Sequence, residues 1–164
     1  MGTPEQVEQL SILANSIWRE HYTPIIGEKQ VKYMLEKFQS SAAISRQINN
    51  QYHYDLVFRD LSPIGYLCVK KKQNDLFLSK IYLIKSERNK GLGKRMINRV
   101  LHYAKELNCD AVTLTVNKQN TKTIAAYLKM GFVQEKAIVM DIGNGFVMDD
   151  YQMRMSLTNL SQGQ

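Results

Sequence analysis

The chain changes from strand to helix within a single stretch, residues 81–94, which reads IYLIKSERNKGLGK. Its first three residues, Ile81, Tyr82 and Leu83, are typical of a strand, and apolar residues recur at helical spacing after Gly93. A helix start presents unpaired backbone N–H groups and about half a positive charge, and glycines let a ligand approach the backbone closely. The stretch is therefore typical of a phosphate site, although Gly-x-Gly before a helix is also ordinary turn chemistry.

Two well-known phosphate motifs do not fit this stretch. A P-loop requires a glycine five residues before Gly93 and Ser or Thr after Lys94, where the chain has Arg88 and Arg95. The dinucleotide fingerprint requires a third glycine where the chain has Met96. Neither nucleotide-binding class fits.

Apolar periodicity predicts the elements on either side of this stretch. The predicted helices are residues 4–18 (ending near His21), 28–39, 40–49, 94–108 and 121–129, with residues 22–27 as a loop around Pro24. The predicted strands are residues 52–59, 64–72, 76–84, 109–116, 132–141 and 146–157, followed by a frayed tail, residues 158–164. Asn120 is predicted to cap the last helix, and Gly131 to end it. The order is α-α-(α)-β-β-β-α-β-α-β-β, a mixed α/β sheet with helices on its faces.

Length and charge set broader limits. The 164 residues, 44% of them hydrophobic, predict one domain, residues 1–164. No run reaches the ~18 apolar residues of a membrane span, and the start lacks a basic-then-apolar leader, so we expect a cytoplasmic protein. Cys68 and Cys109 are predicted to be buried free thiols. A net charge of +7 favours a polyanionic partner, which could be nucleic acid, a membrane surface or a phosphorylated small molecule.

The stretch resembles the pyrophosphate loop of the GNAT (GCN5-related N-acetyltransferase) superfamily, in which Arg or Gln, two variable residues, Gly, one variable residue and Gly or Ala follow one another. Here that pattern is Arg88-Asn89-Lys90-Gly91-Leu92-Gly93. The resemblance extends to the preceding strand Ile81-Tyr82-Leu83, to the later strand residues 113–117, and to residues 125–132 with their Gly-Phe ending. It implies the GNAT fold, with a mostly antiparallel sheet and the family's first strand short or missing.

The resemblance also implies a site for acetyl-CoA. Backbone groups of Ile81 and Leu83 are implied to pair with the pantetheine arm, the amides from Asn89 to Lys94 to hold the pyrophosphate, and Asn120 to touch the cofactor from the other side of the cleft. The implied cofactor-binding residues are Ile81, Tyr82, Leu83, Arg88, Asn89, Lys90, Gly91, Leu92, Gly93, Lys94 and Asn120.

Tyr127 stands at the position of the family's usual general acid, which protonates the departing CoA thiolate. A phenol with a pKa of ~10 and a thiol with a pKa of ~8.5 are close enough for assisted proton transfer. Packing on an amphipathic helix is the alternative for this residue. No base is evident: Thr115 stands where some relatives carry Glu, and the candidate carboxylates Glu20, Glu87, Asp149 and Asp150 are each expected to be surface charges.

The sequence indicates least about the acceptor, the amine that receives the acetyl group. The first two helices and the last hairpin usually wall the acceptor pocket in this fold, so the candidate substrate residues are Trp18, His21, Tyr22, Tyr33 and Asp149. Aromatic rings beside carboxylates could hold a cationic amine. The ends of the chain are similar in layout to PaiA-like polyamine acetyltransferases, which makes a polyamine or other small primary amine the first hypothesis and a peptide or protein amine the second.

Further expectations concern partners. The histidines lack metal-ligand spacing, so no metal is expected. No nucleic acid and no membrane are expected as partners, and a homodimer is a weak expectation from the superfamily. The alternatives to an enzyme are a non-catalytic acyl-CoA sensor, which would not need Tyr127, and a basic nucleic-acid binder, which would be indifferent to CoA.

Overall fold

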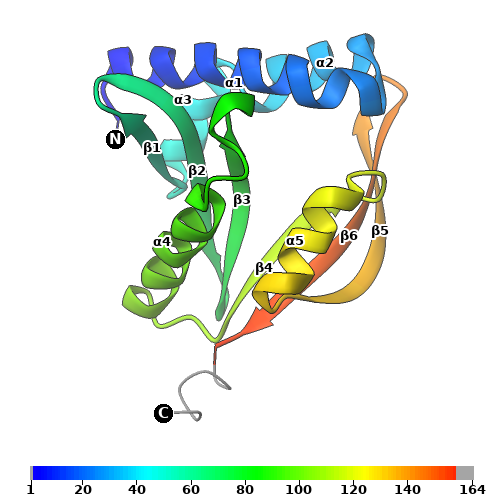
Figure 1. Cartoon of the computed structure of the whole chain (residues 1–164). Coiled ribbons are helices and arrows are strands. Elements are labelled where there is room, and N and C mark those ends of the chain that lie inside the picture. Colours follow the sequence, from blue (N-terminus) through cyan, green and yellow to red (C-terminus); the bar gives the residue numbers. More distant parts are fainter. Residues whose placement is uncertain (1, 158–164) are drawn as a thin grey trace. The chain divides into compact units, whose positions relative to one another are not determined.

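The computed structural model describes residues 2–157, and the predicted frayed tail lies outside them. The elements follow the predicted order, with one additional 3₁₀ turn at Lys85–Glu87 (Figure 1). The helices are α1 (Pro4–Ile26), α2 (Glu28–Phe38), α3 (Ser41–Asn49), α4 (Leu92–Glu106) and α5 (Thr121–Met130). The strands are β1 (His53–Arg59), β2 (Ser62–Lys72), β3 (Asp75–Leu83), β4 (Ala111–Asn117), β5 (Val133–Gly143) and β6 (Phe146–Ser156).

The strands form one six-stranded sheet in the order β1-β2-β3-β4-β6-β5. The pairs β1–β2, β4–β6 and β5–β6 are antiparallel, and β3 and β4 are parallel over three residue pairs, Asp75–Phe77 with Ala111–Thr113. The predicted mixed, mostly antiparallel sheet flanked by helices is confirmed. Within residues 2–157 no strand precedes α1.

The chain divides into two compact units, and β2, β3 and α4 each contribute residues to both. The first unit consists of residues 1–70 and 80–96. In it α1 packs against α2 and α3, and the buried side of α1 contacts Ile44 and the inward-facing residues Tyr54, Tyr66 and Cys68 of β1 and β2. These apolar faces form the core of the first unit.

The second unit consists of residues 71–79 and 97–164. It contains β4, β5 and β6, with α5 lying along these strands (Figure 1). Gly131 ends α5 in the left-handed conformation at a φ of 109°, and its N–H bonds back to the carbonyls of Tyr127 and Leu128. The predicted glycine stop is therefore confirmed, because a residue without a Cβ adopts this conformation without strain.

The prediction of a loop at residues 22–27 was wrong, because α1 continues through Pro24 to Ile26. Proline lacks an N–H and so removes one helical hydrogen bond, but the next turn closes with Gly27 N–H donating to the Thr23 carbonyl at 3.0 Å. The helix ends only at Gly27, where φ is 87°. One lost hydrogen bond does not end a helix whose apolar side, including Ile17 and Trp18, is buried.

The predicted cap of α5 is only half correct. Asn120 does stand at the N-cap position, but its side chain accepts no capping hydrogen bond. Both cysteines are free and buried, as predicted. Within residues 2–157 no helix combines the length and apolar character needed to span a membrane.

Candidate functional site

The loop before α4 has a backbone shape suited to an anion. Asn89 and Gly91 both lie in the left-handed region, with φ values of 63° and 82°. Alternation of this kind turns successive N–H groups toward one side and forms an anion-binding concavity. Within residues 2–157 no protein acceptor takes the N–H groups from Asn89 to Lys94, whereas the next amide, Arg95, bonds to the Gly91 carbonyl.

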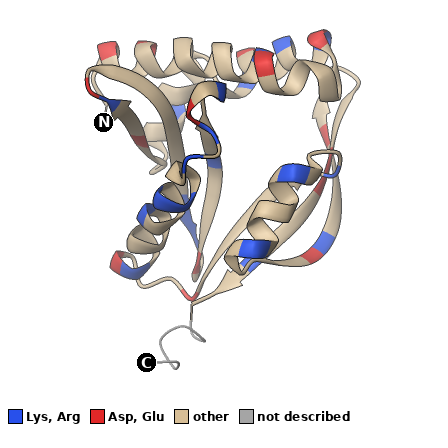
Figure 2. Cartoon of the chain, viewed as in Figure 1, with Lys and Arg blue, Asp and Glu red and all other residues tan. Residues whose placement is uncertain are grey.

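The space and charge around this loop also fit a pyrophosphate. A Cβ built on Gly91 or Gly93 would meet no atom within 4 Å, so the backbone is open to an approaching ligand. Figure 2 shows basic residues in the loop and on the first turn of α4. The exposed Lys90 and Lys94 are among them. Open N–H groups and free lysines at a helix start are what a phosphate requires.

The Arg88 side chain is held by contacts within the first unit. Its Nε donates to the Leu83 carbonyl at 3.1 Å, and its guanidinium forms an ion pair with Glu20 of α1 at 2.8 Å. Glu87 next to it is buried and accepts two hydrogen bonds from Arg59 Nε and one from Arg59 Nη2, the last at 2.6 Å. These pairs fix the loop to α1 and to β1.

The end of β3 presents alternate backbone groups in opposite directions. Ile84 N–H donates to the Ile64 carbonyl of β2 at 2.9 Å, so Leu83 and Ile81, with the opposite orientation, point their N–H groups away from β2. Gly65 of β2 permits close packing here, because a Cβ on it would lie 2.5 Å from the Tyr82 carbonyl oxygen. The Ile81 and Leu83 amides are thus available for an added extended ligand.

Three of the predicted substrate residues gather in one aromatic cluster of the first unit. The Trp18 ring lies 4.4 Å from Tyr22 and 5.6 Å from Tyr82, and His21 lies 4.7 Å from Tyr22. Trp18 is buried, while the other three rings are partly exposed. The ring of Tyr82, which is predicted to contact the cofactor, belongs to this aromatic cluster.

The other two predicted substrate residues lie on other elements. Tyr33, on α2, accepts a hydrogen bond from Lys37 Nζ at 3.3 Å. Asp149, on β6 in the second unit, is exposed and forms an ion pair with Lys118 at 2.7 Å.

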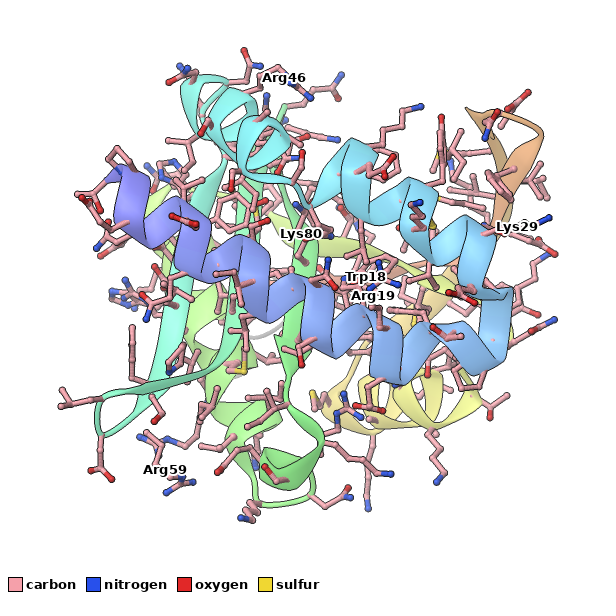
Figure 3. All side chains as sticks on the ribbon, turned by 90° about the horizontal axis from the view of Figure 1, so that it is seen from above. Trp18, Arg19, Lys29, Arg46, Arg59 and Lys80 are labelled. Atoms are coloured by element: carbon pink, nitrogen blue, oxygen red, sulfur yellow. The ribbon has the colours of Figure 1, made fainter. Side chains whose placement is uncertain are left out.

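A buried polar network in the first unit escaped the sequence analysis. Figure 3 looks down on the helices and shows Lys80 in the middle of the view, with Arg46 and Arg59 at the margins. Lys80 is 6% exposed, and its Nζ donates to the Phe38 carbonyl at 2.7 Å, to Gln47 Oε1 at 2.9 Å and to the Tyr54 hydroxyl. Burial lowers the pKa of Lys80 to about 8. No sequence signal distinguished this lysine from an exposed strand residue.

In the second unit, Tyr127 and Asn120 are both buried, at 8% and 6% exposure. The Tyr127 ring packs edge-on against Phe132 at 5.4 Å, and Phe132 N–H donates to the Tyr127 carbonyl. Asn120 N–H donates to the carbonyl of Asn117, the last residue of β4. Both predicted residues therefore belong to the turn and helix that follow β4.

The expectation that the candidate carboxylates are surface charges was wrong for two of them. Glu87 and Asp150 are 8% and 4% exposed. Arg59 lowers the pKa of Glu87, whereas burial raises the pKa of Asp150 to about 6. Their partners lie far away in the sequence, so no local pattern indicates burial. Among residues 2–157 no cluster of three or more His, Cys, Asp or Glu side chains could hold a metal.

Known proteins with this fold use it for acetyl transfer. The model of the acetyltransferase (GNAT) family matches residues 13–132. The spermidine N(1)-acetyltransferase of Thermoplasma acidophilum is 25% identical over 150 residues, covering 88% of this chain and 91% of that protein. The structure of the PaiA N-acetyltransferase from the same organism, in complex with coenzyme A, superposes with a TM-score of 0.79 at 23% identity over 94% of each chain.

Other relatives are more distant. A GNAT acetyltransferase from Elizabethkingia anophelis with bound acetyl-CoA gives a TM-score of 0.59 at 17% identity, covering 70% of this chain and 82% of that one. The N-alpha-acetyltransferase MAK3 of Arabidopsis thaliana is 25% identical over 79 residues, which are 48% of this chain and 40% of that protein.

The chain thus shares its fold with solved acetyltransferases that hold coenzyme A or acetyl-CoA. More specifically, the chain belongs to the acetyltransferase (GNAT) family, and its reaction is the acetyl-CoA-dependent acetylation of an amine.

Proposed function

We propose that this protein transfers the acetyl group of acetyl-CoA to a small primary amine of the polyamine class by direct attack in a ternary complex. The observation that carries the choice of acceptor is the relationship to the Thermoplasma acidophilum protein named spermidine N(1)-acetyltransferase, which spans almost the whole of both chains. The aromatic cluster of Trp18, His21, Tyr22 and Tyr82 supports it, because ring faces attract alkylammonium groups.

The cofactor half of the proposal rests on the first unit. The amides from Asn89 to Lys94 hold the pyrophosphate of acetyl-CoA, with Lys90 and Lys94 supplying charge. The backbone of Ile81 and Leu83 pairs with the pantetheine arm as an added strand would, and Leu83 N–H polarises the thioester carbonyl. Arg88 acts indirectly, because its pair with Glu20 and its bond to the Leu83 carbonyl position the loop.

The resemblance to the family assigns two further roles, Asn120 as a contact to the cofactor and Tyr127 as the general acid. The amine nitrogen forms the new bond to the acetyl carbon, and the departing sulfur takes its proton from the Tyr127 hydroxyl. A phenol does this without carrying a charge itself before the reaction, which suits a residue that is only 8% exposed.

An acceptor screen tests the proposal. Release of free CoA thiol is measured with spermidine, spermine, putrescine, free lysine and a hexapeptide with an unblocked N-terminus. We expect the highest kcat/KM with a polyamine. A higher kcat/KM with the hexapeptide would overturn the choice of acceptor in favour of peptide acetylation. Thiol release with none of the amines, despite thermal stabilisation by acetyl-CoA, would favour an acyl-CoA sensor.

A further inference from the structure

Asp150 lies at the end of β4 from which α5 departs. Its Cα pairs with that of Asn117, the last residue of β4, and Asn117 in turn accepts the Asn120 N–H. Directly opposed residues of antiparallel strands share a face, so Asp150 lies on the same face as Asn117, Thr115 and Gln152. The opposite face carries Met155, which contacts the end of α5 at Gly131.

The Asp150 carboxyl is buried without a cation of its own. It is 4% exposed, and among residues 2–157 no lysine or arginine forms an ion pair with it. Two charged groups act on it, Asp149 next to it on the same strand and Lys118 just beyond β4, and Lys118 is already paired with Asp149. Burial and the charge of Asp149 raise the pKa of Asp150 to about 6, although a hydrogen bond from the Thr115 side chain and the charge of Lys118 lower it.

The other candidate carboxylates are held in ion pairs. Glu20 is paired with Arg88, Glu87 with Arg59, and Asp149 with Lys118, each at 2.6–2.8 Å. Their oxygens are therefore already engaged by a guanidinium or an ammonium group. Asp150 is the member of this group whose surroundings favour the protonated form.

Given an amine acceptor as proposed above, we infer that Asp150 is the general base of the reaction, acting directly or through one water. The Asp150 carboxylate takes one proton from the acceptor ammonium. The freed nitrogen lone pair forms the bond to the acetyl carbon, and the carbon–sulfur bond breaks with its electron pair on sulfur. The nitrogen then loses its second proton, which replaces the one that the Tyr127 hydroxyl has given to sulfur, and Asp150 releases its proton to solvent.

The first test is the pH dependence of turnover, with spermidine or, if another amine of the screen reacts faster, with that amine. For the wild type, kcat/KM falls below pH 6 as Asp150 becomes protonated. Asp150→Asn lowers kcat/KM about 100-fold at pH 7. The loss shrinks as the pH rises towards the pKa of the amine, because free amine then needs no base. Asp150→Glu retains more of the wild-type kcat/KM than Asp150→Asn does. Thr115→Val moves the fall of kcat/KM at low pH to a higher pH, because the hydrogen bond that lowers the pKa of Asp150 is lost.

A matched control is Asp110→Asn, which removes an exposed carboxylate just before the other end of β4 and leaves kcat/KM unchanged. An equal loss at pH 7 and pH 9.5 in Asp150→Asn would indicate a structural role and overturn the inference. Wild-type activity retained in Asp150→Asn at pH 7 would overturn it as well.

The second test needs no acceptor and so separates this inference from the proposed function. The side-chain carboxyl of Asp150, observed by ¹³C NMR, is expected to titrate near pH 6. In the same preparation Asp150→Asn has a higher Tm than the wild type at pH 7.5 and the same Tm at pH 4, because a carboxyl with a raised pKa is unfavourable only when ionised. A titration midpoint below pH 4.5 would overturn the inference, whatever amine the enzyme acetylates.

Discussion

The proposed mechanism gives the Tyr127 hydroxyl the role of general acid. In Tyr127→Phe the ring packing on Phe132 is retained and the hydroxyl that would donate the proton is removed. We therefore expect kcat to fall about 100-fold while the Kd for acetyl-CoA stays the same. An assay of released CoA thiol measures kcat, and calorimetric titration measures the Kd for acetyl-CoA.

The matched control for this substitution is Tyr103→Phe on α4, whose ring faces the Arg99 guanidinium at 4.6 Å and keeps that contact without its hydroxyl. An unchanged kcat in Tyr127→Phe would remove Tyr127 from the role of acid and leave it as a packing residue.

Lys80 makes the stability of the protein depend on alkaline pH. Its pKa is about 8 in the folded chain against the ordinary 10.5, so between these values the unfolded chain binds more protons. Stability therefore rises from pH 8 towards 10.5, by about 3 kcal/mol at 1.36 kcal/mol per pH unit. Denaturant melts of the wild type and Lys80→Met should show this rise only in the wild type. Parallel curves for the two proteins would contradict it.

The loop and first turn of α4 form the element most suited to a direct test of cofactor binding. Gly93 is the second residue of α4, its φ is not positive, and a Cβ there meets nothing within 4 Å. Gly93→Ala should fold normally, with up to about 1 kcal/mol of added stability. The new methyl group occupies the space above the open amides, so the Kd for acetyl-CoA should rise at least about tenfold, or 1.4 kcal/mol.

Gly2→Ala is the control, since its Cβ also meets no atom within 4 Å and lies at the start of the chain. Unaltered acetyl-CoA affinity in Gly93→Ala, measured by calorimetry, would show that the cofactor does not approach this part of the backbone.

At the scale of the whole molecule, the net charge of +7 attracts a cofactor that carries several negative charges. Electrostatic steering is screened by salt, so kcat/KM for acetyl-CoA should fall several-fold between about 50 and 500 mM KCl. Lys90→Gln should flatten this dependence more than Arg46→Gln, which removes a charge from the last turn of α3. Equal slopes in both variants would attribute the effect to overall charge and not to the loop.

The sequence by itself determined the order of the elements, the glycine stop of α5 and the glycine-containing loop before α4. Each is encoded locally, by apolar periodicity or by glycines that permit a particular backbone conformation. Only the tertiary structure decided how far α1 extends past Pro24 and which acidic residues are neutralised. Arg88 forms an ion pair with Glu20, and Arg59 with Glu87, although the partners are far apart in the sequence. The burial of Asp150 and Lys80 is likewise a property of packing. The exposure of a strand residue depends on what covers its face of the sheet, and the covering residues are distant in the sequence.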